Sequence, residues 1–220
     1  MTRYSLDPAE TAMKILFYII IMIAGYILGS LSISILLSKT LLGRDVRKHG
    51  SGNAGATNMA RVFGMHAGIL TLAGDMLKAA AAMLIGYLLC GEVGMMFGGL
   101  ACLLGHCFPV LHGFKGGKGV ASGAMVALAI DWRVFLCVVA AFLIGALLTK
   151  KVSFGSLCGA VAIFISAAAF GVSSPRLILA AGAMLLVIAR HRDNIVRLLN
   201  GSEPDFRPAR PHGRSRKEGC

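Results

Sequence analysis

Long apolar segments separated by short polar ones make up most of this chain. A helix needs ~20 apolar residues to cross the ~30 Å hydrocarbon core, and fewer where the protein covers its ends. Seven segments meet this condition: residues 13–38, 66–90, 93–111, 120–130, 134–148, 154–172 and 177–189. The pattern predicts an all-α integral membrane protein with about seven transmembrane helices. The fourth segment is short, and we expect a half-helix there or a span that begins inside the preceding loop.

The composition agrees with this pattern. Of 220 residues, 56% are hydrophobic and 15% are charged, whereas soluble domains carry about 25% charged residues. The formal net charge is +12, but the basic residues border apolar segments and do not form a domain of their own. This arrangement favours a membrane surface as partner and argues against nucleic acid.

Lysine and arginine are distributed unequally between the two ends of the predicted spans. Seventeen of them fall in or beside residues 39–64, 112–119, 149–153 and the segment from Arg190 onward, against four on the other side. Because basic loops stay in the cytoplasm, we expect the N-terminus outside and the C-terminus in the cytoplasm. Residues 1–206 are interpreted as one membrane domain, and residues 207–220 as a basic, flexible cytoplasmic tail.

Two further patterns lie inside the apolar segments. Pairs of glycines four positions apart, which let membrane helices approach closely, occur at 25 and 29, 94 and 98, and 155 and 159. Asp75 and Lys78 are three positions apart, so they can pair on one helix face. The pattern leaves two interpretations open, an ion pair that stabilises the fold and a direct part in catalysis.

The first polar segment, residues 47–61, lies on the basic side. It contains Gly50, Gly52 and Gly55 among serine, asparagine and threonine. Glycine favours tight irregular backbone, and hydroxyls, amides and free backbone N–H groups are suited to bind an anionic oxygen. The segment is therefore expected to form an irregular anion-binding loop.

The second polar segment, residues 105–119, interleaves glycines with Lys115 and Lys118. Such a loop allows N–H groups and ammonium ions to converge on phosphate. It is not a Walker A loop, because the glycine spacing differs and Lys118 is followed by glycine. A helix from Val120 would direct its N-terminal dipole at the same anion.

The third polar segment, residues 190–203, follows the last predicted span. His191, Asn194 and Leu198 would share one face of a helix. A histidine at the membrane edge can accept a proton, donate to an oxyanion or serve a structural role. Ser153 and Ser156 could add hydroxyl donors at the same rim or cap a helix.

Several familiar reaction motifs are absent from the sequence. No histidine is followed five positions later by aspartate, no aspartate is followed by glycine, and no G-x-S-x-G occurs. These absences argue against an HxxxxD acyltransferase, a CDP-alcohol phosphotransferase and a nucleophile elbow.

Together the three polar segments resemble one known family. The strings GSGNAGATNMAR (50–61), GHCFPVLHGFKGGKGVAS (105–122) and HRDNIVRLLNGSE (191–203) are similar to the three signature motifs of the bacterial membrane glycerol-3-phosphate acyltransferases of the PlsY type. Order, spacing and hydropathy match from about residue 13 to 206. Ser122, where threonine is more usual, and the His112-Gly113 pair are minor departures.

The resemblance implies an inner-membrane enzyme with a cytoplasmic active site that acts in phospholipid biosynthesis. It would transfer an acyl chain from acyl phosphate to the 1-hydroxyl of sn-glycerol 3-phosphate, giving 1-acyl-sn-glycerol 3-phosphate and phosphate. No metal and no cofactor are expected, and the partners are the two substrates and membrane lipids. The implied catalytic residues are Ser51, Arg61, Lys118, His191 and Asn194. The implied substrate-binding residues are Asn53, Thr57, Asn58, Lys115, Gly116, Gly117 and Ser156.

A mixed anhydride is already activated, so positioning and charge neutralisation can suffice without an acyl-enzyme. Two other classes fit parts of the sequence. A transporter of a phosphorylated solute would place polar residues at both membrane faces and often has two related halves. A purely structural lipid-binding protein would not need three dense polar segments. The polar residues here gather on one side, and no internal repeat is found.

Overall fold

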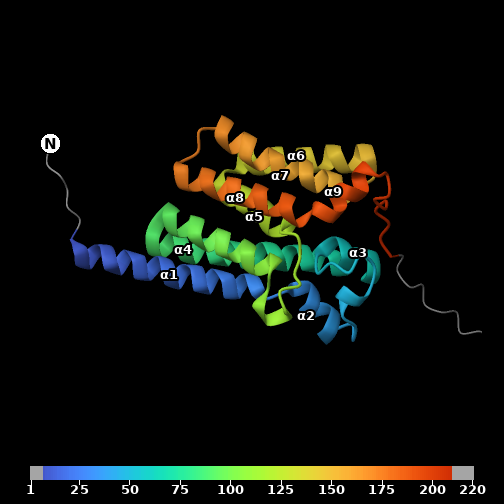
Figure 1. The fold of residues 1–220 in the computed structure, drawn as a ribbon, viewed down its shortest axis with the longest axis horizontal. Helices are drawn as coiled ribbons and strands as arrows, with labels where there is room; N and C mark the ends of the chain where they lie inside the picture. The colour runs from blue at the N-terminus through green and yellow to red at the C-terminus, as the bar shows by residue number, and fades with distance from the viewer. Residues whose placement is uncertain (1–6, 210–220) are drawn as a thin grey trace, which may run out of the picture.

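The computed structural model describes residues 7–209, and they form an all-helical protein (Figure 1). This confirms the all-α class that the sequence predicts. The helices are α1 (Pro8–Ser30), α2 (Ile33–Thr40), α3 (Ala56–Phe63), α4 (Met65–Cys107), α5 (Val120–Ile130), α6 (Trp132–Thr149), α7 (Val152–Ala169), α8 (Ser174–Arg190) and α9 (Arg192–Leu199). Two short 3-10 turns, η1 (Val46–Lys48) and η2 (Val110–His112), lie in the loops.

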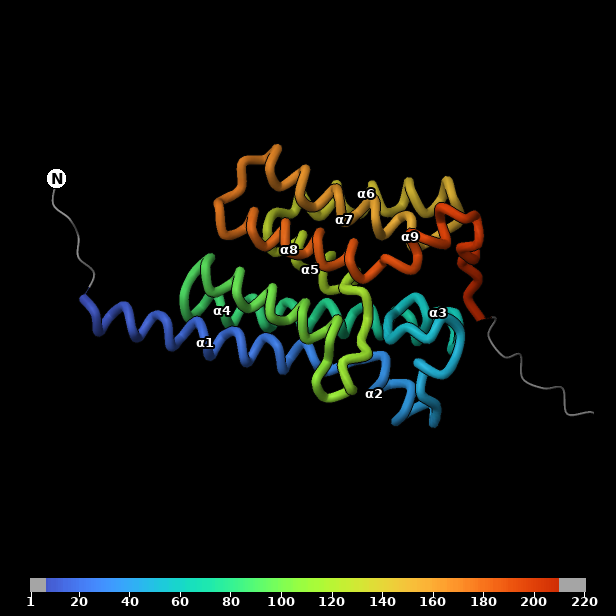
Figure 2. Tube along the Cα trace, in the orientation of Figure 1, coloured from blue at the N-terminus to red at the C-terminus, as the bar shows by residue number. Residues whose placement is uncertain are grey.

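The segment α4 is a helical hairpin. Its backbone leaves the helical region at Cys90 and Gly91, where Gly91 has φ 59°. A Cβ on Gly86 would lie under 3.0 Å from the carbonyl oxygen of Gly94, although residues eight apart in a straight helix are ~12 Å apart. The chain therefore reverses at Cys90–Gly91, and its two arms lie side by side (Figure 2). The two apolar segments predicted from the sequence, 66–90 and 93–111, are separated close to this bend.

Glycine also brings α1 against the second arm of α4. The space for a side chain on Gly25 is filled by the backbone of Gly98, and on Gly29 by the backbone of Cys102. Gly105 likewise lies against the carbonyl of Tyr26. These contacts confirm the prediction that the small residues pack helices closely, because any Cβ would separate the two backbones.

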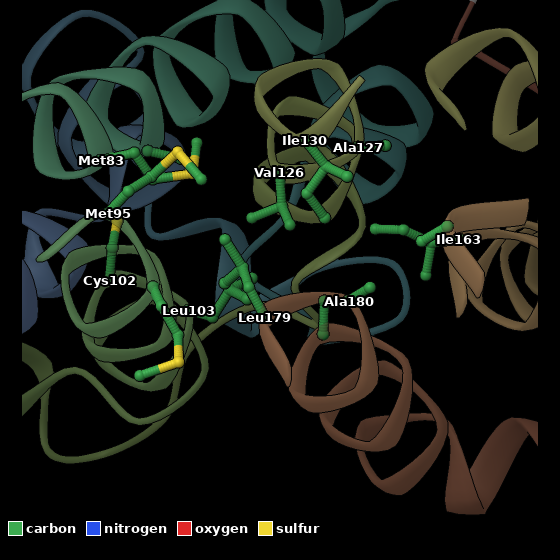
Figure 3. Packing of buried hydrophobic residues seen from close by; sticks show 14 of the residues in the cluster. Met83, Met95, Cys102, Leu103, Val126, Ala127, Ile130, Ile163, Leu179 and Ala180 are labelled. Atoms are coloured by element: carbon green, nitrogen blue, oxygen red, sulfur yellow. The ribbon is translucent and has the colours of Figure 1, made fainter. Parts of the chain in front are cut away.

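The helices form two groups that face each other (Figure 1). α1 and α4 lie along one side, α6, α7 and α8 along the other, and α5 lies between them in contact with α4, α6 and α8. Figure 3 shows the apolar core at this junction, where Met83 and Leu103 of α4, Val126 of α5, Ile163 of α7 and Leu179 of α8 converge. The short helix α5 therefore joins both groups.

By length and composition, four helices of the described chain can cross a membrane, or five if the bent pair of α8 and α9 counts as one. That count takes the α4 hairpin as one helix and leaves out α5, which has 11 residues. Large apolar side chains lie exposed on several helices, for example Leu88, Leu147 and Leu148 at 74–80%. Such faces suit a hydrocarbon solvent. Seven crossings and their orientation stay predictions.

Two segments differ in detail from the sequence-based ranges. The first predicted span, 13–38, is broken at Leu31 and Ser32 into α1 and α2. The first polar segment is not irregular throughout, because α3 begins inside it at Ala56. Of the predicted tail, the structure describes residues 207–209, where the Ala209 amide donates to the Ala60 carbonyl of α3. Residues 210–220 lie outside the described residues.

The hairpin packing yields a stability prediction. Gly86→Ala pushes a methyl group into the backbone of the other arm, and we expect it to cost about 1–3 kcal/mol through overpacking. Gly159→Ala is the matched control, because its nearest neighbour would be 3.4 Å away. The thermal unfolding midpoint in detergent is expected to fall for Gly86→Ala and to hold for Gly159→Ala. Equal midpoints for the two variants would contradict the tight hairpin.

Candidate active site

A polar pocket of about 370 Å³ lies where the three polar segments meet. Nine of the twelve residues expected at the site line its wall: Ser51, Asn53, Thr57, Asn58, Arg61, Lys118, Ser156, His191 and Asn194. They come from the loop before α3, α3 itself, the loop before α5, α7 and the junction of α8 with α9. Segments far apart in sequence therefore supply one site.

Asn58 shapes the first polar segment. Its side-chain Oδ1 accepts from the Ser51 amide at 2.9 Å, and its Nδ2 lies 3.0–3.2 Å from the carbonyls of Val46, His49 and Asn53. The residue is 1% exposed. Gly50, at φ 60°, has no room for a side chain because Asn58 Oδ1 occupies that space. The Asn58 amide thus folds the loop around itself and holds Ser51 and Asn53 at the pocket wall.

Helix α3 presents its N-terminus to the pocket. Gly55 is the N-cap and supplies no side-chain hydrogen bond, so the first N–H groups of the helix are available to an anion. Thr57 and Arg61 stand four positions apart on this helix and both line the pocket. Among the residues that the structure describes, Arg61 forms neither a hydrogen bond nor a salt bridge. Its guanidinium is therefore free to pair with a ligand.

Two glycines of the second polar segment, Gly116 and Gly117, pack the loop and do not line the pocket. Side-chain space at Gly116 and Gly117 is taken by the main chain and ring of His106, and the Gly117 amide donates to the His106 carbonyl at 3.1 Å. Lys115 is exposed and also lies outside the pocket wall. Three of the expected substrate-binding residues are thus not brought into the pocket. Because Gly116 and Gly117 pack tightly against His106, Lys118 is the one expected residue of this segment that reaches the pocket wall.

A chain of polar side chains joins the second and third segments. The Lys118 ammonium donates to Asn194 Oδ1. Asn194 Nδ2 donates to Glu203 Oε1 at 2.6 Å, and Arg197 Nε donates to Glu203 Oε2 at 2.7 Å. Glu203 is 8% exposed. The carboxylate therefore anchors Asn194 and Arg197, and Asn194 in turn fixes the Lys118 ammonium.

Burial shifts the titration of these groups. It lowers the pKa of Lys118 to about 8, although the nearby Glu203 carboxylate acts in the opposite direction. Burial by itself would raise the pKa of Glu203, but hydrogen bonds from neighbours including Arg197 and Asn194 hold it below its usual value. At neutral pH the site contains a cationic Lys118 and an anionic Glu203.

His191 is held in one tautomer. Its Nδ1 lies 2.7 Å from the Val187 carbonyl, and since a carbonyl accepts only, Nδ1 carries the hydrogen. Burial lowers the pKa of His191 to about 4, so the ring is neutral at pH 7. Nε2 therefore offers a lone pair to a hydroxyl group bound in the pocket.

Asp75 and Lys78 form the ion pair that their spacing predicts, at 2.8 Å, and both are buried. The same ammonium donates to the carbonyls of Gly29 and Leu31 at the end of α1 and lies 3.0 Å from His106 Nδ1. A cation there satisfies carbonyls that the helix leaves unpaired. Asp75 and His106 also line the pocket. The pair thus connects α1, both arms of α4 and the pocket wall.

The sequence-based prediction missed three polar residues of the wall: His106, Arg197 and Glu203. Ser153, which the sequence offered as a hydroxyl donor at this rim or as a helix cap, lines the wall as well. Arg197 follows Asn194 by one helical turn, a spacing that could have identified it in place of Leu198. Glu203 lies in the third motif string but beyond the helix. Its role depends on the chain turning back after α9, which helical spacing does not reveal.

An apolar groove of about 270 Å³ adjoins the polar pocket. The two cavities share Leu72, Val120, Phe142 and Ser156 as walls. The groove continues between α4, α5, α6, α7 and α8, and Ser156 is the one polar side chain among the described residues in its wall. A ligand with a polar head and an apolar tail would fit the two cavities together.

Comparison with known proteins agrees with a site that combines a polar pocket with an apolar groove. The family model described as glycerol-3-phosphate acyltransferase matches residues 19–201. A glycerol-3-phosphate acyltransferase of Finegoldia magna is 38% identical over 196 residues, 87% of this chain and 97% of the relative. One of Syntrophotalea carbinolica is 41% identical over 196 residues, covering 86% and 98%. The crystal structure of PlsY (YgiH), an integral membrane glycerol 3-phosphate acyltransferase, in its glycerol 3-phosphate form has a TM-score of 0.82 and 38% identity, and the match covers 86% of this chain and 96% of that one.

The fold and site therefore define a multi-pass membrane acyltransferase. The chain belongs to the glycerol-3-phosphate acyltransferase family, and within it to the PlsY type.

The pKa of Lys118 generates a pH prediction. Sulfate stays a dianion between pH 7 and 9, so any weakening of its binding reports on the protein. As the pH rises through about 8, Lys118 loses its charge, and sulfate affinity is expected to fall. In Lys118→Arg the guanidinium stays charged, and the affinity measured by calorimetry is expected to stay flat. The same decline in both proteins would contradict a titrating Lys118.

The buried ion pair generates a stability prediction. Lys78→Met leaves the Asp75 carboxylate buried without its partner, a change that typically costs about 3–5 kcal/mol. We expect a large drop in the thermal midpoint, partly recovered in Asp75→Asn/Lys78→Met. Lys14→Met, which removes an exposed ion pair with Glu10, is the control and is expected to leave the midpoint unchanged. If Lys78→Met were as stable as this control, the buried ion pair would not stabilise the fold.

Proposed function

We propose that this protein transfers a fatty acyl chain from acyl phosphate to the 1-hydroxyl of sn-glycerol 3-phosphate. The products are 1-acyl-sn-glycerol 3-phosphate and inorganic phosphate, an early step of phospholipid synthesis. The observation that carries the proposal is the junction of a cationic polar pocket with an apolar groove through four shared wall residues. Relatives named glycerol-3-phosphate acyltransferase support the acceptor.

The donor is assigned to the side of the pocket formed by the first polar segment. Its phosphate would meet Ser51, the N-terminus of α3 with Thr57, and the unpaired Arg61 guanidinium, with Asn53 beside them. Asn58 acts by holding this loop in shape, because its amide is already bonded to four backbone groups. The acyl chain would leave the head group past Val120, Phe142 and Ser156 into the groove.

Glycerol 3-phosphate is assigned to the side formed by Lys118, Asn194 and Arg197. Its phosphate would be neutralised by the Lys118 ammonium, which Asn194 and Glu203 hold in place. Its 1-hydroxyl would donate a hydrogen bond to His191 Nε2, which the Val187 carbonyl orients through Nδ1. This places a nucleophile and an activated carbonyl between two cationic sites.

The chemical step is a direct displacement at the acyl carbonyl carbon. The glycerol oxygen forms a bond to that carbon, and the bond from the carbon to the phosphate oxygen breaks with its electron pair on phosphate. Since the pKa of His191 is lowered to about 4, the ring orients the hydroxyl but does not keep its proton, which passes to phosphate. Arg61 balances the charge on the departing phosphate, while Lys118 holds the phosphate of the acceptor.

The proposed location is the bacterial inner membrane, with the pocket open to the cytoplasm. The basic turn between α6 and α7 lies at the pocket end of the molecule, where Lys151 donates to the Glu203 carbonyl and the Phe206 amide to the Lys150 carbonyl. Basic residues favour the cytoplasmic side, and water-soluble glycerol 3-phosphate is available there.

The test is phosphate release by purified protein from palmitoyl phosphate, with and without glycerol 3-phosphate. Release is expected to require glycerol 3-phosphate and to fall about 10²–10³-fold in Lys118→Ala, as for loss of one charge-stabilising donor. Lys39→Ala, an exposed residue outside the pocket, is the control. With donor alone, mass spectrometry is expected to find no acylated Ser51.

Other outcomes would redirect the assignment. Product from palmitoyl-CoA but not from palmitoyl phosphate would keep the acceptor and overturn the donor. Labelled glycerol 3-phosphate crossing proteoliposomes, with no acylated product from either donor, would favour a transporter of phosphorylated solutes.

A further inference from the structure

The apolar groove has a definite depth. On α7, Ser156 lies at its junction with the polar pocket and Ile163 lines it seven residues further along. On α6, Phe142 lies at the junction and Phe135 is seven residues away. Because seven helical residues rise ~10 Å, both walls give the groove the same depth.

The far end of the groove is closed by the core. Ile163 is 3% exposed and belongs to the same buried cluster as Ile130, Val134 and Ala167, which are 0–1% exposed. Phe135 packs against this cluster, and Ala167 lies one turn beyond Ile163 on α7. Close-packed side chains thus stand directly behind Phe135 and Ile163, and a longer chain could not pass them without disrupting the core.

We propose that Phe135 and Ile163 limit the length of the acyl chain. Gly123, which lacks a side chain, keeps the groove open between the junction and these two residues. This inference rests on the proposed acyl transfer but holds for any acyl donor, since it concerns the tail alone. An extended chain advances ~1.2 Å per bond, as three backbone bonds span ~3.6 Å. The groove therefore accepts about eight carbons beyond the level of Ser156, and further carbons meet the closed end.

Gly123 offers a second position at which the depth can be changed. It lines the groove on α5, three residues past Val120, which lies at the junction. A Cβ there would meet Val187 Cγ2 alone, at 3.9 Å. A side chain at this position would project into open groove ~4.5 Å from the junction and block what lies beyond.

The experiment measures kcat/KM for a series of acyl phosphates and the matching acyl-CoA thioesters, from octanoyl to stearoyl, with glycerol 3-phosphate saturating. Phe135→Ala is expected to shift the preferred donor longer by about two carbons or more. Gly123→Val is expected to shift it shorter by about four. Each methylene newly accommodated or excluded is expected to change kcat/KM about fourfold, the equivalent of ~0.8 kcal/mol per buried CH₂.

Two controls change the same bulk on the lipid-facing side of α6. Leu136→Ala, at a residue 54% exposed, matches Phe135→Ala, and Ala140→Val, also exposed, matches Gly123→Val. Both are expected to keep the wild-type chain profile. Each profile compares the kcat/KM values of different acyl chains in one preparation, so a loss of folded protein cancels from the comparison. Ile163→Val and Gly123→Ala provide milder variants.

The outcomes separate the two proposals. Active wild-type protein whose profile is unchanged in Phe135→Ala and Gly123→Val would overturn the depth limit and leave the acyl transfer standing. Equal shifts in the controls would overturn it too. Wild-type protein that acylates glycerol 3-phosphate from neither donor series would overturn the proposed function and the depth limit with it.

Discussion

The burial of Lys118 is the constraint on which the site depends. A cation that is largely removed from water is stable only with polar partners in place. Here Asn194 provides the direct partner, and the Glu203 carboxylate behind it compensates the charge. That chain of contacts fixes the loop before α5 against α9. Lys118 also lines the pocket whose wall carries Arg61, so the proposed function has two cations available for phosphate.

A second buried cation performs a different task. Lys78 lies beneath the pocket, where it satisfies the carbonyls at the end of α1 and pairs with Asp75. The glycine contacts of the α4 hairpin hold its two arms close enough for Lys78 and His106 to meet. The two cations thus divide the work. Lys78 pairs with Asp75 and with carbonyls at the end of α1, so the protein itself neutralises its charge, whereas Lys118 lines the pocket.

Much of this could be predicted from the sequence, for physical reasons. Apolar runs long enough for a bilayer marked the helices, the range 120–130 coincides with α5, and the spacing of Asp75 and Lys78 gave their ion pair. The motif strings contain eight of the nine expected residues that line the pocket wall, and Ser156 was expected there in addition. The differences between these expectations and the pocket wall share a cause. Gly116 and Gly117 pack against His106, and Glu203 reaches Asn194 only because the chain turns back after α9. Such contacts depend on tertiary packing, which local spacing does not encode.

The central claim is that the polar pocket and the apolar groove together bind the two substrates and that acyl transfer takes place where they meet. Its most direct test is a structure determined with glycerol 3-phosphate and a non-hydrolysable alkyl phosphonate bound. The account predicts both phosphorus atoms in the polar pocket, near Lys118 and Arg61, with the alkyl chain running past Phe142 and Ser156 toward Ile163. A phosphonate bound at the exposed Lys115, or an alkyl chain lying on the outer face of α6, would contradict it.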